Sequence, residues 1–231
     1  MKYWCYNVTK LVCWLVFRIG FGLDVRGQEH VPSTGPFILA SNHVSFLDPP
    51  LVGVACPRPV TFMARADLFH HRALDLFLRG VRVIALARDE PDLGAIRRAV
   101  ARLRDGEGVG IFPEGGRQLS GRLGRAKRGV GLLAELAQAP IIPVLVSGTY
   151  EALPPQATRL HRAKIRVAFG PPIPYTDSPV FPVAESQHRP DEDGPRRERS
   201  PSRDRHLHLA EVVTQAWRRL EQQLHDTRVR A

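Results

Sequence analysis

Short strand-like runs alternate with helix-like stretches from about residue 24 to residue 170, and this alternation constrains the fold more than any other feature. The strand-like runs are Leu23–Arg26, Phe37–Ser41, Val60–Met63, Arg82–Ala87, Val109–Phe112, Ile141–Ser147 and Lys164–Phe169. Between them apolar residues recur at helical spacing, for example from Leu93 through Ile96 and Val100 to Leu103. The pattern predicts a single layered α/β domain with a central mixed, largely parallel sheet flanked by helices.

Residues 1–23 precede this domain and are rich in aromatic and aliphatic side chains. Charged residues interrupt them, so no run reaches the roughly 18 apolar residues of a membrane-spanning helix. We expect an amphipathic helix lying in a membrane interface, with Lys2, Lys10 and Arg18 facing lipid phosphates. A helix packed against the domain is the alternative.

The chain after residue 170 divides into two parts. Residues 171–205 are rich in Pro, Arg, Ser, Asp and Glu and hold almost no large apolar groups after Phe181, which predicts a disordered basic connector. Residues 206–231 regain apolar residues at helical spacing and predict a C-terminal helix that docks on the domain. The expected units are therefore 1–23, 24–170, 171–205 and 206–231.

Composition narrows the classes of function. The 231 residues are 43% hydrophobic, which is typical of a globular protein, and carry a formal net charge of +10. That charge favours anionic partners: nucleic acid, a lipid surface or phosphorylated substrates. No nucleic-acid-binding module is recognisable. The three cysteines show no CxxC spacing, which argues against a disulfide scaffold and a thiolate zinc site.

His43 and Asp48 stand five residues apart just after a predicted strand. A histidine suits general-base chemistry near neutral pH, and an aspartate bound to its other ring nitrogen would orient it. Asp48-Pro49-Pro50 is typical of a helix start, with Asp as the cap and Pro in the first turn. The same spacing recurs at His70–Asp75 and His188–Asp193, so context alone favours the first pair.

A second candidate segment runs from Phe112 to Arg117, after another predicted strand. Gly115 and Gly116 allow a sharp turn and a close backbone approach to a ligand. Arg117 could grip a phosphate bidentately, and Glu114 could bind a substrate hydroxyl or hold Arg117. Two further basic residues are candidates for the same anion: Arg88 at a strand end and Lys127 at a helix start. A surface turn with ordinary surface charge is the alternative interpretation.

Four blocks, in order between about Val25 and Gly170, resemble the signature blocks of the 1-acylglycerol-3-phosphate acyltransferase (glycerolipid acyltransferase, PlsC-like) family. The blocks are Asn42-His43-x-Ser45-x-x-Asp48, Gly80 to Arg88, Phe112-Pro113-Glu114-Gly115-x-Arg117 and Ile141-Ile142-Pro143-Val144. The resemblance implies an acyltransferase that moves an acyl group from a thioester to the hydroxyl of a lysophospholipid.

The resemblance also implies residue roles. His43 would deprotonate the acceptor hydroxyl, Asp48 would orient His43, Arg88 and Arg117 would hold the acceptor phosphate, and Glu114 would help place its glycerol part. Gly115 and Lys127 would complete the substrate site. No metal and no cofactor are implied; acyl-CoA or acyl-acyl carrier protein is the co-substrate, and the carrier protein is a candidate partner. The expected location is peripheral or monotopic, on the anionic cytoplasmic face of the cell membrane.

The sequence departs from the family at two places. Gly116 stands where the family usually has Thr or Ser, and Phe77-Leu78-Arg79 stands where a Pro usually precedes the glycine of the second block. Both affect the phosphate side of the site, so the identity of the acceptor stays open. The leading acceptor is 1-acylglycerol-3-phosphate. The alternatives are another lysolipid or an aminolipid, and a non-catalytic protein that binds anionic lipid.

Overall fold

The computed structural model describes residues 4–70, 72–86, 92–175 and 201–229. Its strands confirm all the predicted runs, with ends that differ by no more than two residues. The strands are β1 (Asp24–Arg26), β2 (Phe37–Ser41), β3 (Val60–Arg65), β4 (Ile84–Leu86), β5 (Gly108–Ile111), β6 (Ile141–Ser147) and β7 (Arg166–Phe169).

These strands form one sheet in the order β1-β7-β6-β2-β5-β3-β4. The neighbours from β6 to β4 all run parallel. β7 is antiparallel to β6, and β1 pairs with β7 in the parallel sense. The sheet is therefore mixed and largely parallel, as predicted, and β2 lies between β6 and β5 near its centre.

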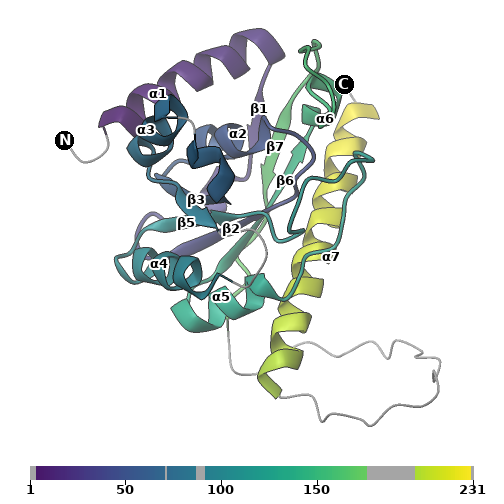
Figure 1. The fold of residues 1–231 in the computed structure, drawn as a ribbon. Helices are drawn as coiled ribbons and strands as arrows, with labels where there is room; N and C mark the ends of the chain where they lie inside the picture. The colour runs from purple at the N-terminus through teal and green to yellow at the C-terminus, as the bar shows by residue number, and fades with distance from the viewer. Residues whose placement is uncertain (1–3, 71, 87–91, 176–200, 230–231) are drawn as a thin grey trace, which may run out of the picture.

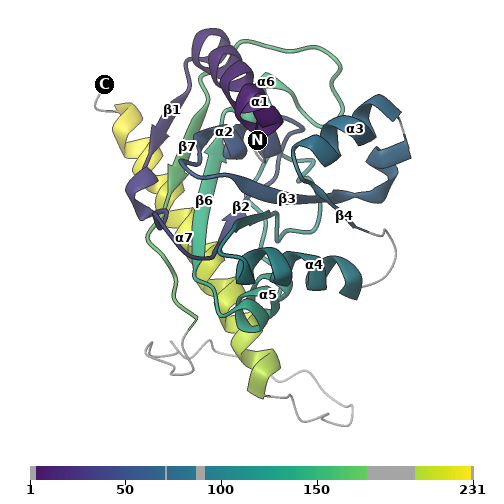
Figure 2. The same ribbon diagram turned by 90° about the vertical axis from the view of Figure 1, so that its left-hand side faces the viewer.

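Helices cover both faces of the sheet (Figure 1). The helical elements are α1 (Trp4–Leu15), the π-helix η1 (Val16–Gly20), the 3-10 helices η2 (Gln28–His30) and η3 (Ala66–His70), α2 (Asp48–Ala55), α3 (Arg72–Gly80), α4 (Leu93–Arg104), α5 (Gly129–Ala137), α6 (Thr149–Ala152) and α7 (Pro201–Val229). The side chains of α4, α5 and α7 pack in one core cluster and those of α2 and η1 in another. Figure 2 shows α4 and α5 on the opposite side of the sheet from α1.

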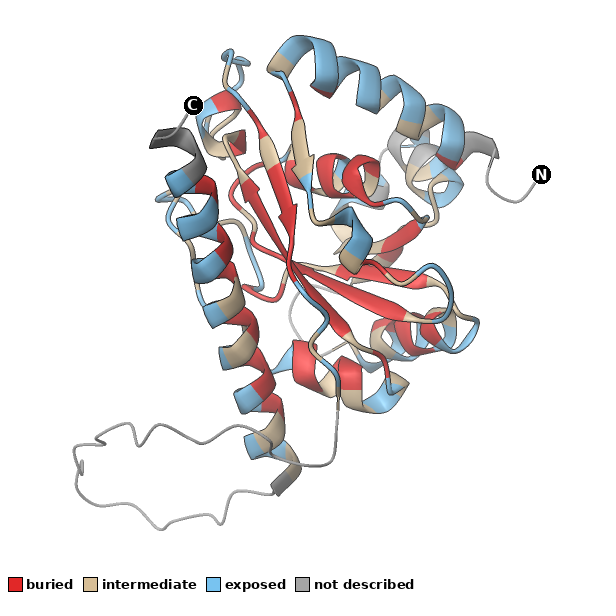
Figure 3. Cartoon of the chain, turned by 180° about the vertical axis from the view of Figure 1, so that it is seen from behind, coloured by how far each residue is buried: buried red, intermediate tan, exposed pale blue. Residues whose placement is uncertain are grey.

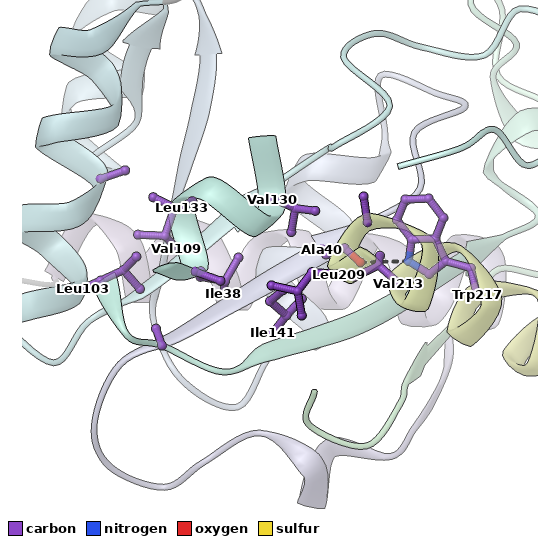
Figure 4. Packing of buried hydrophobic residues seen from close by; sticks show 14 of the residues in the cluster. Ile38, Ala40, Leu103, Val109, Val130, Leu133, Ile141, Leu209, Val213 and Trp217 are labelled. Atoms are coloured by element: carbon purple, nitrogen blue, oxygen red, sulfur yellow. Dashed lines mark hydrogen bonds between the residues drawn. The ribbon is translucent and has the colours of Figure 1, made fainter. Parts of the chain in front are cut away.

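Strand β2 divides its side chains between the two cores. Phe37 and Leu39 pack toward α2, whereas Ile38 and Ala40 pack toward α5 and α7. This period of two is the geometry of a strand, and all five β2 residues are buried because both faces are covered. Figure 4 shows the core between the sheet and helices α5 and α7, where the indole N–H of Trp217 donates to the backbone oxygen of Ala40 at 2.9 Å.

The expected boundary between connector and C-terminal helix is wrong by five residues. α7 begins at Pro201 rather than at residue 206, and proline suits the first helical turn because no backbone N–H is needed there. The start of the expected connector is also ordered: Ile173 exchanges two backbone hydrogen bonds with Ile141, at 2.9 and 2.8 Å. Residues 176–200 lie outside the described residues.

α1 lies in the segment for which an interfacial helix was expected, and part of it packs on the domain. Tyr6 is buried, and its hydroxyl accepts the backbone N–H of Val60 at 3.2 Å. The expectation that Lys10 faces lipid is wrong, because its ammonium donates to the backbone oxygen of Cys56 at 2.5 Å. Partial burial lowers the pKa of Lys10.

The rest of α1 and η1 is largely exposed, as Figure 3 shows. Its exposed apolar side chains are Val8, Leu11, Val12, Trp14, Leu15, Val16 and Ile19. These positions recur every three or four residues, so most of them share one helical face. Among the described residues, no helix combines the length and the apolar character that crossing a bilayer requires.

Candidate active site

The two candidate segments meet because the strands before them are neighbours. β2 and β5 pair in parallel, so both strands end at the same edge of the sheet. Contacts then join the segments that follow. The backbone N–H of His43 donates to Oε2 of Glu114 at 2.7 Å, and the backbone N–H of Gln118 donates to the oxygen of His43 at 2.8 Å. Residues 71 positions apart in sequence thus form one site.

The carboxylate of Asp48 orients His43 from a fully buried position. Its Oδ2 lies 2.9 Å from Nδ1 of His43 and accepts the backbone N–H groups of Val44 and Ser45, both at 2.7 Å. Because this oxygen accepts two N–H groups, Nδ1 of His43 donates to it as well. Nε2 is then the basic nitrogen of the ring, as general-base chemistry requires.

The expectation that Asp48 caps its own helix is wrong. Leu47 precedes α2, no side-chain hydrogen bond caps the helix, and the carboxylate of Asp48 reaches backward to the loop before it. The expected proline in the first turn is confirmed. Asp48 therefore holds the loop that carries His43 as well as the ring itself.

The other two pairs with the same spacing differ from His43–Asp48. His70 lies in η3, and the carboxylate of Asp75 accepts from the guanidinium of Arg79 at 2.6 Å. His188 and Asp193 lie outside the described residues. Of the two pairs within the described residues, the His43 pair alone joins a hydrogen-bonded histidine to the end of a central strand.

Phe112 supports the ring of His43. The two rings stack with centroids 4.2 Å apart and planes inclined by 26°, and the His43 side chain is 16% exposed. Phe62 in turn stacks on Phe112 at 6.0 Å. Phe112 belongs to the second candidate segment, where no role was expected for it; its place as an aromatic residue directly after a central strand was the available signal.

Glu114 points inward and joins the loops of the site. Its Oε2 accepts from His43, as described above, and its Oε1 accepts the backbone N–H of Gly124 at 2.9 Å. Only 4% of the residue is exposed. Burial raises the pKa of Glu114 to about 7, against the two hydrogen bonds that lower it, and the nearby charge of Asp48 raises it further. This placement favours a role in positioning His43 over direct contact with a substrate.

The basic residues lie around the glycine turn. Gly115 has a φ of +77°, and a Cβ built there would come within 2.7 Å of Nζ of Lys127, so the ammonium lies against this turn. The guanidinium of Arg117 lies over the ring of Phe46, 3.5 Å from its centroid. Gly116 is exposed, with no heavy atom within 4 Å of a Cβ placed on it. These groups offer positive charge at the edge of the sheet that carries His43. Arg88 lies outside the described residues.

Three further contacts of the site come from distant parts of the chain. The amide of Asn42 donates to the backbone oxygen of Val146 at 3.0 Å and accepts its N–H at 2.7 Å, which extends the pairing of β2 with β6 beyond the strand end. Ser45 Oγ donates to the oxygen of Leu153 at 2.7 Å. Asn42 and Ser45 stand beside His43 in the first block, but the local sequence does not indicate these distant partners.

The hydroxyl of Thr214 on α7 accepts the backbone N–H of Ala126, next to Lys127, at 3.0 Å. Together with the bond from Trp217 to Ala40 in β2, this contact ties α7 to the strand before His43 and to the loop before Lys127. Nothing in the local sequence of α7 indicated it.

Comparisons with known proteins match this chain to one family. The family model described as Acyltransferase matches residues 22–147. A 1-acyl-sn-glycerol-3-phosphate acyltransferase of Bacillus subtilis is 27% identical over 80% of this chain and 88% of its own length. The human 1-acyl-sn-glycerol-3-phosphate acyltransferase alpha is 31% identical over 68% of this chain and 57% of its own length.

The same fold occurs in the crystal structure of the 1-acyl-sn-glycerophosphate acyltransferase PlsC from Thermotoga maritima. Its TM-score is 0.70 at 23% identity, over 95% of this chain and 80% of that one. The match of the family model covers both candidate segments and more than half of the chain. The chain belongs to the acyltransferase family, and the protein is an acyltransferase.

Proposed function

We propose that the protein transfers an acyl group from an acyl thioester to the free hydroxyl of 1-acylglycerol-3-phosphate, which gives phosphatidic acid. The observation that carries this proposal is the hydrogen-bonded pair His43–Asp48 beside the basic turn of Gly115, Arg117 and Lys127. The names of the relatives from Bacillus subtilis and human support the acceptor.

In the proposed reaction, Nε2 of His43 removes the proton of the acceptor hydroxyl as its oxygen attacks the thioester carbonyl. The buried carboxylate of Asp48 stabilises the imidazolium that forms. The tetrahedral intermediate then expels the thiolate, which takes the proton from His43, and the ester product remains. The guanidinium of Arg117 and the ammonium of Lys127 bind the acceptor phosphate, and Arg88 assists them.

The thioester carrier is acyl-CoA or acyl-acyl carrier protein, and no further cofactor is needed. We also propose a peripheral location on the cytoplasmic face of the cell membrane, because the acceptor is a lipid. The exposed apolar face of α1 supports this location.

An acyl-transfer assay of the purified protein tests the proposal. A panel of lysolipids and aminolipids is offered with each thioester carrier, and His43→Ala is compared with His70→Ala as a matched histidine control. We expect transfer to 1-acylglycerol-3-phosphate, its loss in His43→Ala and its retention in His70→Ala. Equal activity of the two variants would overturn the assignment of the base, and preference for another acceptor would overturn the assignment of the substrate.

A further inference from the structure

A second exposed segment, Arg159–Lys164, combines basic and apolar side chains. It holds Arg159, Arg162 and Lys164, all exposed, and no acidic residue stands between Glu151 and Asp177. Leu160, between the two arginines, is 61% exposed. An exposed leucine flanked by cations is the composition that interfacial membrane segments use.

This segment lies beside the end of the N-terminal helix, although about 140 residues separate them in sequence. The backbone N–H of Ile165 donates to the oxygen of Phe21 at 3.2 Å, and the N–H of Asp24 donates to the oxygen of Ile165 at 3.0 Å. Figures 1 and 3 both show the loop before β7 next to the end of η1. The basic segment therefore lies next to the end of η1, which continues the helix that exposes apolar side chains.

A cavity of about 640 Å³ lies where the two elements meet. Trp14, Leu23 and Val54 are among its apolar lining residues, and Arg18 and Lys164 supply its positive charge. Arg18 is held in place by a 3.0 Å hydrogen bond from Nη1 to the oxygen of Leu23. The acidic lining residue, Asp24, accepts from Nε of Arg26 at 3.2 Å.

We propose that Arg159–Lys164 is a second membrane-contacting element, and that the cavity between Arg18 and Lys164 takes the anionic headgroup of a bilayer phospholipid. Apolar burial or basic charge alone gives weak, reversible attachment, whereas the two together give stable attachment. The apolar face of α1 supplies the apolar burial, and this basic segment supplies the basic charge. The inference rests on the proposed membrane-surface function and adds a lipid class and a site to it.

Vesicle sedimentation of the full chain tests the proposal. The vesicles are phosphatidylcholine alone or phosphatidylcholine mixed with phosphatidylglycerol. The test variant neutralises the segment (Arg159→Gln, Arg162→Gln, Lys164→Gln). The control variant removes the same charge from exposed positions on α4 and α7 (Arg97→Gln, Arg104→Gln, Arg219→Gln). Thermal unfolding of each variant verifies that it is folded.

Each basic residue near an anionic bilayer strengthens binding about fivefold, so the test variant should bind the phosphatidylglycerol vesicles about a hundredfold more weakly than wild type. The control variant should bind them nearly as wild type does. Leu160→Ala should weaken binding to both kinds of vesicle about tenfold. Equal binding of the test and control variants would overturn this inference alone. A wild-type protein that binds neither vesicle would overturn the proposed membrane location as well.

Discussion

Replacing Glu114 by Gln tests whether the Glu114 side chain positions His43 or contacts the substrate. The carboxylate accepts the backbone N–H groups of His43 and Gly124, at 2.7 and 2.9 Å. A glutamine can accept only one of them, because its NH2 group would face the other donor. The loop that carries His43 then loses a contact, so we expect kcat to fall while the KM for the acceptor changes little.

The effect on stability follows from the raised pKa of Glu114. A carboxyl group whose pKa rises from 4.5 to about 7 on folding binds its proton more tightly in the folded state than in the unfolded state. At about pH 8 its ionised form therefore reduces the free energy of unfolding by about 3 kcal/mol. Gln removes this cost, and it leaves one buried N–H without an acceptor, which costs about 1–3 kcal/mol. The two nearly cancel, so the variant should unfold near the wild-type free energy at that pH.

Lowering the pH should change the free energy of unfolding of wild type and of the Glu114→Gln variant by different amounts. Stability from a raised carboxyl pKa is full below the unfolded value and is lost as the pH rises through the folded value. Wild type should therefore gain about 2 kcal/mol between about pH 8 and about pH 5.5 from Glu114 alone, and the variant should lack this gain. Urea unfolding at both pH values measures the difference. If the difference in free energy of unfolding between wild type and variant is the same at both pH values, the claim that Glu114 carries a buried carboxylate is refuted. A raised KM for the acceptor with unchanged kcat would refute the positioning role.

Three further substitutions test other parts of the site. Arg117→Ala should raise the KM for the phosphorylated acceptor about tenfold or more and leave that for the thioester unchanged; equal effects in steady-state kinetics would exclude phosphate binding. Trp217→Phe keeps the buried ring and removes the bond to Ala40, so urea unfolding should show a loss of about 1–3 kcal/mol; no loss would exclude a stabilising bond. Gly116→Ser meets no atom and should change the free energy of unfolding by less than about 0.5 kcal/mol; a larger loss would show that the turn needs glycine.

The strands and the first segment of the site were predictable because local patterns encode them. β2 and β6 begin and end where their apolar runs do, since a buried strand needs a short continuous apolar stretch. His43 and Asp48 are five residues apart, so a single turn can bring them together. Their hydrogen bond follows from local geometry once β2 ends at Ser41.

Contacts between distant residues were not predictable in this way. The direction of the Glu114 side chain depends on Gly124 and on His43 in a neighbouring strand's loop. The ammonium of Lys10 turns toward Cys56 because α1 packs on α2, and a helical pattern does not specify that packing. Asp48 reaches backward instead of capping α2 because three donors converge on its Oδ2.

The sequence by itself determined the α/β class, the strand positions and the two segments that carry His43 and Glu114. Tertiary structure alone decided that these segments adjoin, because strand order sets which ends share an edge of the sheet and apolar periodicity carries no information about order. It also decided that α7 supports the site, through a hydrogen bond from Trp217 to Ala40 that spans 177 residues. The two residues lie far apart in the chain, so no local sequence pattern predicts such a bond.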